Sequence, residues 1–230
     1  MRLKQTVVPT LALALALPMA AQMGIGPQVP TLSGVWHPVV GTGSAYDRAD
    51  KNGKKSQIEI TIVGQEDVNG KSAFWLEMGV ADPRSGGQMY AKALMTVADN
   101  SVSSTKIVMQ QPGQDPMEID MAAMPNVPGG RMHQTMPSDV RDKAEVVGTE
   151  SITVPAGTFT CQHYRMKDGS SDVWVSDKVF PWGLVKSQDK DSSSMVLTKL
   201  ITDAKDHITG TPRKFDPMQI MRDRMGQQGQ

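Results

Sequence analysis

Methionine is the residue type in this chain whose number and spacing suggest a chemical role. The sequence of 230 residues contains 17 methionines. Thioether sulfur is a soft ligand that favours Cu(I), so closely spaced methionines beside a histidine could form a copper site. One stretch has such spacing, and copper binding by a Met-rich segment is therefore one hypothesis. Its candidate metal ligands are Met121, Met124, Met132, His133 and Met136.

The same residue type also suits an apolar binding surface. Methionine is unbranched and polarizable, so it fills irregular cores and lines adaptable grooves. Methionine, alanine and leucine recur at alternate positions of segments with the period of a β-strand, which places them on one face of each segment. They predict an apolar groove, and groove lining and copper binding stay open as alternatives. The candidate groove residues are Leu76, Met78, Met89, Met95 and Met109.

Motifs for covalent or cofactor chemistry are missing from the sequence. It has no G-x-S-x-G, P-loop or dinucleotide fingerprint, and none of its histidines has the spacing of a zinc site. Cys161 is the only cysteine, and a buried thiol is its expected role. His163 follows two positions later, so in a strand both side chains share a face, and a thiolate–imidazole pair is the alternative. We expect a protein that is not an enzyme and uses no cofactor.

Charge is balanced along the chain. Lysine plus arginine number 24, aspartate plus glutamate number 24, and the formal net charge is 0 with both signs interspersed. Nucleic-acid-binding proteins carry a basic patch or stripe, so nucleic acid is not an expected partner.

The first residues have the pattern of an export signal. Arg2 and Lys4 precede an apolar run that ends in small residues. We expect residues 1–21 to be a signal peptide cleaved near Ala20 or Ala21, which places the mature protein in the periplasm or outside the cell. The apolar run is shorter than the roughly 20 residues that span a bilayer, so no transmembrane segment is expected in the mature chain.

The candidate groove residues belong to a succession of short strands. Ile58, Ile60 and Ile62 occupy alternate positions, and Asn69-Gly70 predicts a hairpin turn before the next alternating run. Proline-rich residues 111–139 predict a long loop that includes one short strand, followed by a helical turn at Ser138–Lys143. The pattern is typical of an antiparallel meander of about nine or ten strands. After the hairpin turn, the predicted strands cover 74–80, 89–97, 102–110, 117–121, 144–154, 158–167, 172–176, 183–188 and 195–202.

One β-rich domain is predicted over residues 34–205, because no linker divides this stretch. A leader rich in Gly, Pro and Gln covers residues 22–33 and is expected to be flexible. A tail covers residues 206–230, and Asp216-Pro217 in it is a suitable start for a short amphipathic helix.

Residues 146–186 carry a further pattern, made of separate positions and two short runs. Its members are Glu150, Thr153–Phe159, Tyr164, Trp174, Ser176 and Gly183–Lys186. The pattern resembles uncharacterised exported bacterial β-rich families that are similar to the LolA-like periplasmic lipoprotein carriers and their half-barrel relatives. The resemblance implies a mainly β fold: a single curved, mostly antiparallel, half-barrel-like sheet with one or two short helices. It also implies an apolar groove, which in the carriers holds acyl chains.

The leading functional hypothesis is an exported soluble protein that binds a lipid-like or other hydrophobic molecule in an apolar groove, without catalysis. Copper binding in the periplasm by the Met-rich segment is one alternative. The other is a structural or interaction module of the envelope, whose C-terminal amphipathic segment docks on a protein partner.

Overall fold

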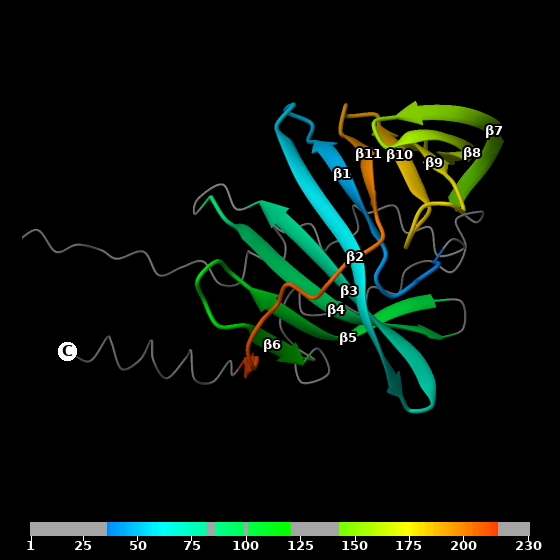
Figure 1. Cartoon of the computed structure of the whole chain (residues 1–230). Helices are drawn as coiled ribbons and strands as arrows, with labels where there is room; N and C mark the ends of the chain where they lie inside the picture. Colours follow the sequence, from blue (N-terminus) through cyan, green and yellow to red (C-terminus); the bar gives the residue numbers. More distant parts are fainter. Residues whose placement is uncertain (1–35, 82–85, 99–100, 121–142, 216–230) are drawn as a thin grey trace, which may run out of the picture.

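The residues that the structure describes form a single twelve-stranded sheet (Figure 1). The computed structural model describes residues 36–81, 86–98, 101–120 and 143–215. In chain order the strands are β1 (Gly43–Ala49), β2 (Lys55–Val68), β3 (Lys71–Ala81), β4 (Gln88–Ala98), β5 (Ser101–Gln110), β6 (Met117–Asp120), β7 (Ala144–Val154), β8 (Gly157–Met166), β9 (Ser171–Val175), β10 (Leu184–Asp189), β11 (Ser194–Ile201) and β12 (Arg213–Lys214).

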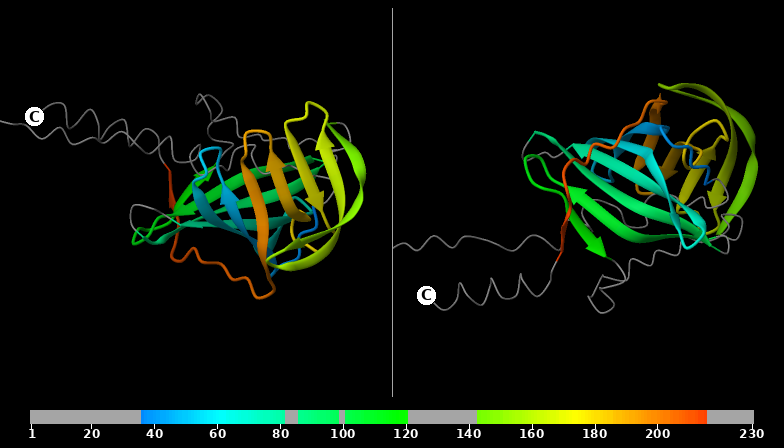
Figure 2. Two further views of the ribbon diagram at one scale, coloured as in Figure 1. Left: turned by 90° about the horizontal axis from the view of Figure 1, so that it is seen from above. Right: turned by 60° about the horizontal axis from the view of Figure 1, so that its bottom comes forward.

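The strand order shows that the chain builds one side of the sheet outward from β1 and the other side inward, from the edge strand β7 to β11. The order is β12-β6-β5-β4-β3-β2-β1-β11-β10-β9-β8-β7, and every pair is antiparallel except β12 with β6. We call β2–β6 with β12 the first wing and β7–β11 the second wing. The wings meet where β1 pairs with β11. The second wing bends round at one end of the molecule (Figure 2). The predicted single curved, mostly antiparallel sheet is therefore confirmed.

Alternating apolar residues and a tight turn produce the β2–β3 hairpin. Ile58, Ile60 and Ile62 are all buried, because they point to the same face of β2. Asn69 and Gly70 both have positive φ, at 55° and 75°. Two successive residues with positive φ match the twist of a two-residue hairpin turn, and Asn-Gly is the preferred pair there. The hairpin predicted from these residues is confirmed.

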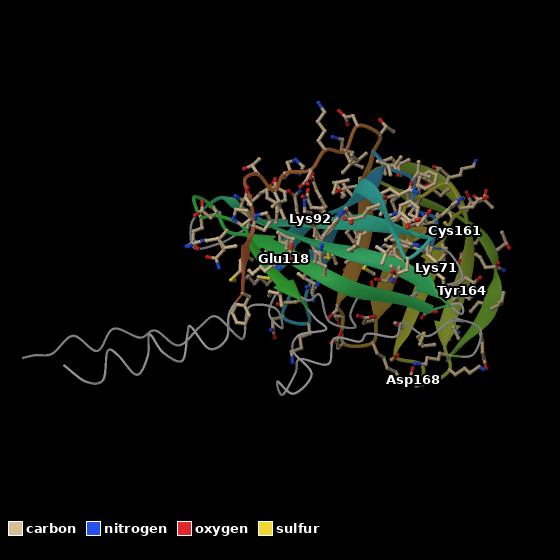
Figure 3. All side chains as sticks on the ribbon, turned by 90° about the horizontal axis from the view of Figure 1, so that it is seen from below. Lys71, Lys92, Glu118, Cys161, Tyr164 and Asp168 are labelled. Atoms are coloured by element: carbon tan, nitrogen blue, oxygen red, sulfur yellow. The ribbon has the colours of Figure 1, made fainter. Side chains whose placement is uncertain are left out.

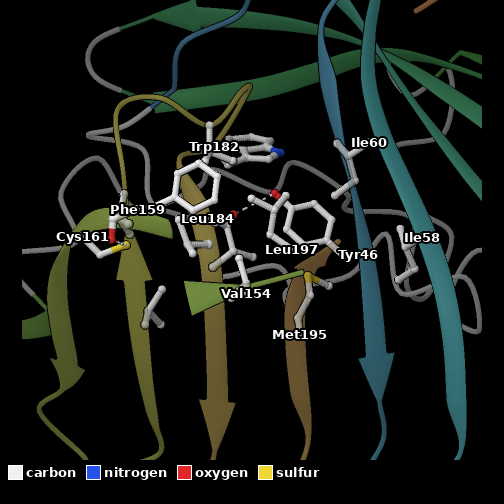
Figure 4. Packing of buried hydrophobic residues seen from close by; sticks show 14 of the residues in the cluster. Tyr46, Ile58, Ile60, Val154, Phe159, Cys161, Trp182, Leu184, Met195 and Leu197 are labelled. Atoms are coloured by element: carbon white, nitrogen blue, oxygen red, sulfur yellow. Dashed lines mark hydrogen bonds between the residues drawn. The ribbon is translucent and has the colours of Figure 1, made fainter. Parts of the chain in front are cut away.

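The main core lies between the two wings and is filled by large side chains (Figure 4). Tyr46 of β1 is 1% exposed, and its hydroxyl donates a hydrogen bond to the Leu184 carbonyl at 3.0 Å. Burial raises the pKa of Tyr46. The loop between β9 and β10 adds Val179 and Trp182, both buried, and the Trp182 ring lies 4.4 Å from that of Trp36. This loop thus packs the junction between the wings with its own side chains.

Two strands were not predicted from the sequence. β1 contains only small, polar and charged residues besides Tyr46, so it lacks an alternating apolar pattern. β12 has two residues and depends on its pairing with β6. The helical turn predicted at 138–143 falls, except for Lys143, outside the described residues, and so does the helix predicted from Asp216. No helix in the part of the chain that the structure describes is long and apolar enough to cross a membrane.

Candidate functional site

The five candidate groove residues come together on one face of β3, β4 and β5. Strand register places Met78 opposite Ala91, and Ala91 opposite Met109. Residues that pair directly in a sheet point to the same face, and so do residues two positions apart in a strand. By this rule Leu76 and Met95 share the face, and so does Met89. We call this surface the methionine face.

The methionine face continues the main core toward the edge of the first wing. Leu76, Met78 and Met95 belong to the main core, at 8%, 7% and 5% exposure. Met109 belongs to a separate small cluster with Ala91 and Ile107, against which Met89, Ala93 and Ile119 pack. Met89 is partly exposed. Short alanine side chains here stand beside long, flexible methionines.

The candidate copper ligands all lie in a stretch that the structure leaves undescribed. Met121, Met124, Met132, His133 and Met136 fall within residues 121–142. Within the described ranges, no group of three or more His, Cys, Asp or Glu side chains could hold a metal ion. Copper binding therefore stays a prediction.

Cys161 has the buried structural role expected from its type. Its side chain is fully buried in the main core, and its thiol donates to the Phe159 carbonyl at 3.6 Å. Burial, and to a smaller extent the charge of Glu150, raise the pKa of the thiol to about 11. A thiol with so high a pKa is scarcely ionised at neutral pH. A reactive thiolate–imidazole pair of Cys161 with His163 is therefore not supported.

His163 instead connects strands of the second wing. Its Nδ1 lies 3.0 Å from Glu150 Oε1, and its Nε2 lies 2.7 Å from Asp172 Oδ1. Trp174 stacks on the imidazole with ring centroids 4.4 Å apart and donates its indole N–H to Glu150 at 2.6 Å. The ammonium of Lys186 lies 4.9 Å from the Trp174 ring centre. Both ring nitrogens of His163 are occupied by carboxylates, so this arrangement joins β7, β8, β9 and β10 rather than presenting a free base.

A second polar group lies on the first wing and includes Lys92 of β4, which Figure 3 shows well apart from Cys161. Glu77 of β3 is 1% exposed, and both its oxygens face His207. The backbone N–H of His207 donates to Oε2 at 3.1 Å, and its Nδ1 lies 2.7 Å from Oε1. The His207 ring stacks on Tyr90, with centroids 4.5 Å apart and planes at 8°. Lys92 forms an ion pair with the adjacent Asp206.

Sequence reasoning missed this group, because nothing local indicates it. Glu77 alternates with Leu76 and Met78, as an ordinary outward-facing strand residue does. His207 is 130 positions further along the chain. Burial is the main cause that raises the pKa of Glu77; hydrogen bonds with His207 lower it, and a hydrogen bond with Asp206 raises it again.

Comparisons with known proteins assign no family to this chain. No protein-family model matches it, and no curated protein matches it. Among solved structures, a candidate lipoprotein from Parabacteroides distasonis is 17% identical with a TM-score of 0.35, covering 72% of this chain and 98% of its own.

Two further solved structures are similar at comparable levels. A candidate exported protein from Bacteroides fragilis, described as having a YmcC-like fold, is 14% identical with a TM-score of 0.34, covering 72% of this chain and 98% of its own. MucB is 14% identical with a TM-score of 0.41, covering 79% of this chain and 60% of its own. No family assignment follows from values this low.

Proposed function

We propose that this chain is an exported, non-enzymatic protein that binds a lipid-like or other hydrophobic molecule on the methionine face. One observation carries the proposal: three neighbouring strands place Leu76, Met78, Met89, Met95 and Met109 on the same face of the sheet. These residues continue the core toward β5 and β6, and Met89 of β4 is partly exposed.

The chemistry of the methionine face favours hydrocarbon as the ligand. Methionine adapts its three side-chain torsions to an irregular partner. The alanines between the methionines have short side chains and leave space beside them. Each methylene group transferred from water to such a surface contributes about 0.8 kcal/mol. The side chains that define the face carry no charge, so nothing on it favours an ionic headgroup.

The polar groups of the second wing support the non-enzymatic part of the proposal. His163 is occupied at both ring nitrogens by carboxylates. The Cys161 thiol is buried, with its pKa raised to about 11. Neither group is arranged as a nucleophile with a free base beside it.

Ligand extraction and probe binding test the proposal together. Full-length protein isolated from its native cell envelope should release a reproducible hydrophobic compound into organic solvent, identified by mass spectrometry. A fluorescent fatty acid should then bind the stripped protein. Met89→Lys puts a charge on the partly exposed end of the methionine face and should weaken binding at least about tenfold, a loss of about 1.4 kcal/mol.

Val147→Lys is the matched control. Val147 is 49% exposed on β7, away from the methionine face, so the same charge there should leave probe affinity unchanged. The proposal is contradicted if both variants bind the probe equally well. It is also contradicted if the isolated protein carries no compound and the stripped protein binds no probe.

A further inference from the structure

The chain after β11 runs across the first wing as an extended segment. We call residues 202–215 the strap; before β12 it has no regular structure. It leads from β11 to the edge of the sheet at β6 (Figure 1). There β6 pairs with β5 on one side and with β12, near the end of the strap, on the other. The strap therefore covers the edge of β6 that would otherwise face outward.

The middle of the strap is anchored on the first wing by several contacts. The backbone N–H of His207 donates to the carboxyl group of Glu77 at 3.1 Å. Ile208 is buried, at 8% exposure. The Thr209 N–H donates to the side chain of Gln110 at 3.0 Å, and that side chain donates back to the Thr209 carbonyl at 3.2 Å. These contacts are made with β3 and β5, so the middle can stay in place when β12 separates from β6.

The end of the strap contacts β6 through a short parallel pairing. The Arg213 N–H donates to the Pro116 carbonyl at 2.9 Å, and the Phe215 N–H donates to the Glu118 carbonyl at 2.8 Å. β12 has two residues, each paired with one residue of β6, and both are exposed. Gly210, with a φ of 88°, lies between this end and the anchored middle. So short a pairing of exposed residues can open without unfolding the rest of the sheet.

Charge determines which strand fits this edge. Lys214 lies directly opposite Glu118, and the guanidinium of Arg213 lies 3.5 Å from the carboxylate of Asp115. The side chains of Arg213 and Asp115 are 76% and 74% exposed, so their ion pair contributes little to stability. Complementary charges nevertheless suppress wrong partners, because like charges placed side by side repel each other. The edge therefore accepts a basic strand and disfavours an acidic one.

We propose that the edge of β6 is a docking site for an extended basic segment of a partner protein, and that residues 213–215 occupy this site when the partner is absent. An open strand edge presents N–H and C=O groups, so an added strand gains main-chain hydrogen bonds. The carboxylates of Asp115 and Glu118 select basic residues in that strand. The site lies at the edge of the sheet rather than on the methionine face, and it does not depend on a hydrophobic ligand.

The chain's own segment competes with the partner for this edge. A tethered segment competes at an effective concentration set by its linker, which for short flexible linkers is in the millimolar range. The basic segment of the partner must therefore displace residues 213–215 before it pairs with β6. Removing the backbone donors of this segment should open the edge.

Proline variants of the full-length protein distinguish an open edge from an occupied one. The double variant Arg213→Pro with Phe215→Pro lacks both N–H groups that donate to β6, because proline has no backbone N–H. Lys214→Pro is the matched control. Backbone groups alternate in direction along a strand, so the Lys214 N–H points away from β6 and its loss should keep the pairing. If circular dichroism shows that the double variant does not fold, Arg213→Glu with Lys214→Glu replaces it and opens the edge by repulsion.

The probe is a fluorescently labelled peptide with the sequence of residues 211–215, Thr-Pro-Arg-Lys-Phe. In fluorescence anisotropy it should bind the double variant at least about tenfold more tightly than wild type or Lys214→Pro, in which the tethered segment competes. A peptide with glutamate in place of both basic residues should bind the double variant at least about tenfold more weakly than the probe. Adding Glu118→Lys to the double variant should reduce this difference, because the edge is then less acidic.

Three results would overturn the proposal. If the double variant binds the probe no better than wild type does, residues 213–215 do not occupy a docking site. If the two peptides bind the double variant equally, charge does not select the partner strand. If the double variant sediments as a dimer, the open edge takes a second copy of this chain instead of a basic segment.

Discussion

Neighbouring residues of β3 point to different faces of the sheet. Leu76 and Met78 point to the methionine face, while Glu77 between them points to the opposite face and contacts His207. Because side chains of a strand alternate between faces, one residue step separates the apolar methionine face from a buried carboxyl group. A substitution at Glu77 can therefore be tested for its effect on the methionine face, and a substitution at Met78 for its effect on the environment of Glu77.

Cys161 gives the clearest residue-scale prediction. With a pKa of about 11, about one thiol in a thousand is ionised at pH 8, and the side chain is fully buried. The native protein should therefore resist alkylation by iodoacetamide at this pH, and the unfolded protein should be modified completely. Mass spectrometry of both samples gives the measurement. Rapid modification of the native protein would show that the thiol is accessible and reactive.

At the scale of elements, β1 matters more than its sequence indicates. It pairs with β2 on one side and with β11 on the other, so it connects the wings within the sheet. Its first residue, Gly43, has no room for a side chain: a Cβ there would lie 2.3 Å from the Ile60 carbonyl oxygen and 2.7 Å from the Thr61 Cα. The close approach of β1 to β2 therefore depends on glycine.

Gly43→Ala should lower the free energy of unfolding by about 1–3 kcal/mol, because the backbone of β2 would have to move. Gly64→Ala is the matched control in the same sheet. A Cβ at Gly64 would meet the Trp75 Cδ1 at 3.4 Å, an ordinary contact, so this variant should match the wild type or gain up to about 1 kcal/mol. Urea unfolding of the three proteins gives the comparison. Equal losses in both variants would mean that the β1–β2 contact is not the cause.

At the scale of the whole molecule, the main core makes the wings interdependent. It contains Ile60 and Met78 from the first wing together with Val175 and Leu184 from the second. β1 precedes the first wing in the chain and β11 is the last strand of the second wing, so their pairing joins segments from the two ends of the sheet's sequence. Neither wing can bury its apolar face without the other.

We therefore expect one cooperative unfolding transition. Tryptophans report from both wings, with Trp75 on β3 and Trp174 on β9. In a denaturant titration, tryptophan fluorescence and far-ultraviolet circular dichroism should give the same midpoint, because both report the loss of one shared core. Midpoints that differ beyond error would show that the wings unfold separately.

Much of the sheet and the composition of the methionine face were predictable from the sequence. Strand alternation depends on residues two positions apart, and the Asn69-Gly70 turn depends on two neighbours. Such signals lie within a few residues, so they can be read without knowing the fold. They indicated most strands and placed apolar side chains on one face of each, including Met78 and Met89.

What the tertiary structure decided is how distant segments meet. The pairing of β1 with β11 has no local signal, since β1 lacks an apolar pattern and its partner strand lies near the other end of the domain. The contact between Glu77 and His207 joins residues that are 130 positions apart. Glu77 is buried on the side of the sheet where His207 contacts it. The sequence by itself therefore determined the strands and their apolar faces, and the fold determined which charged side chain became buried.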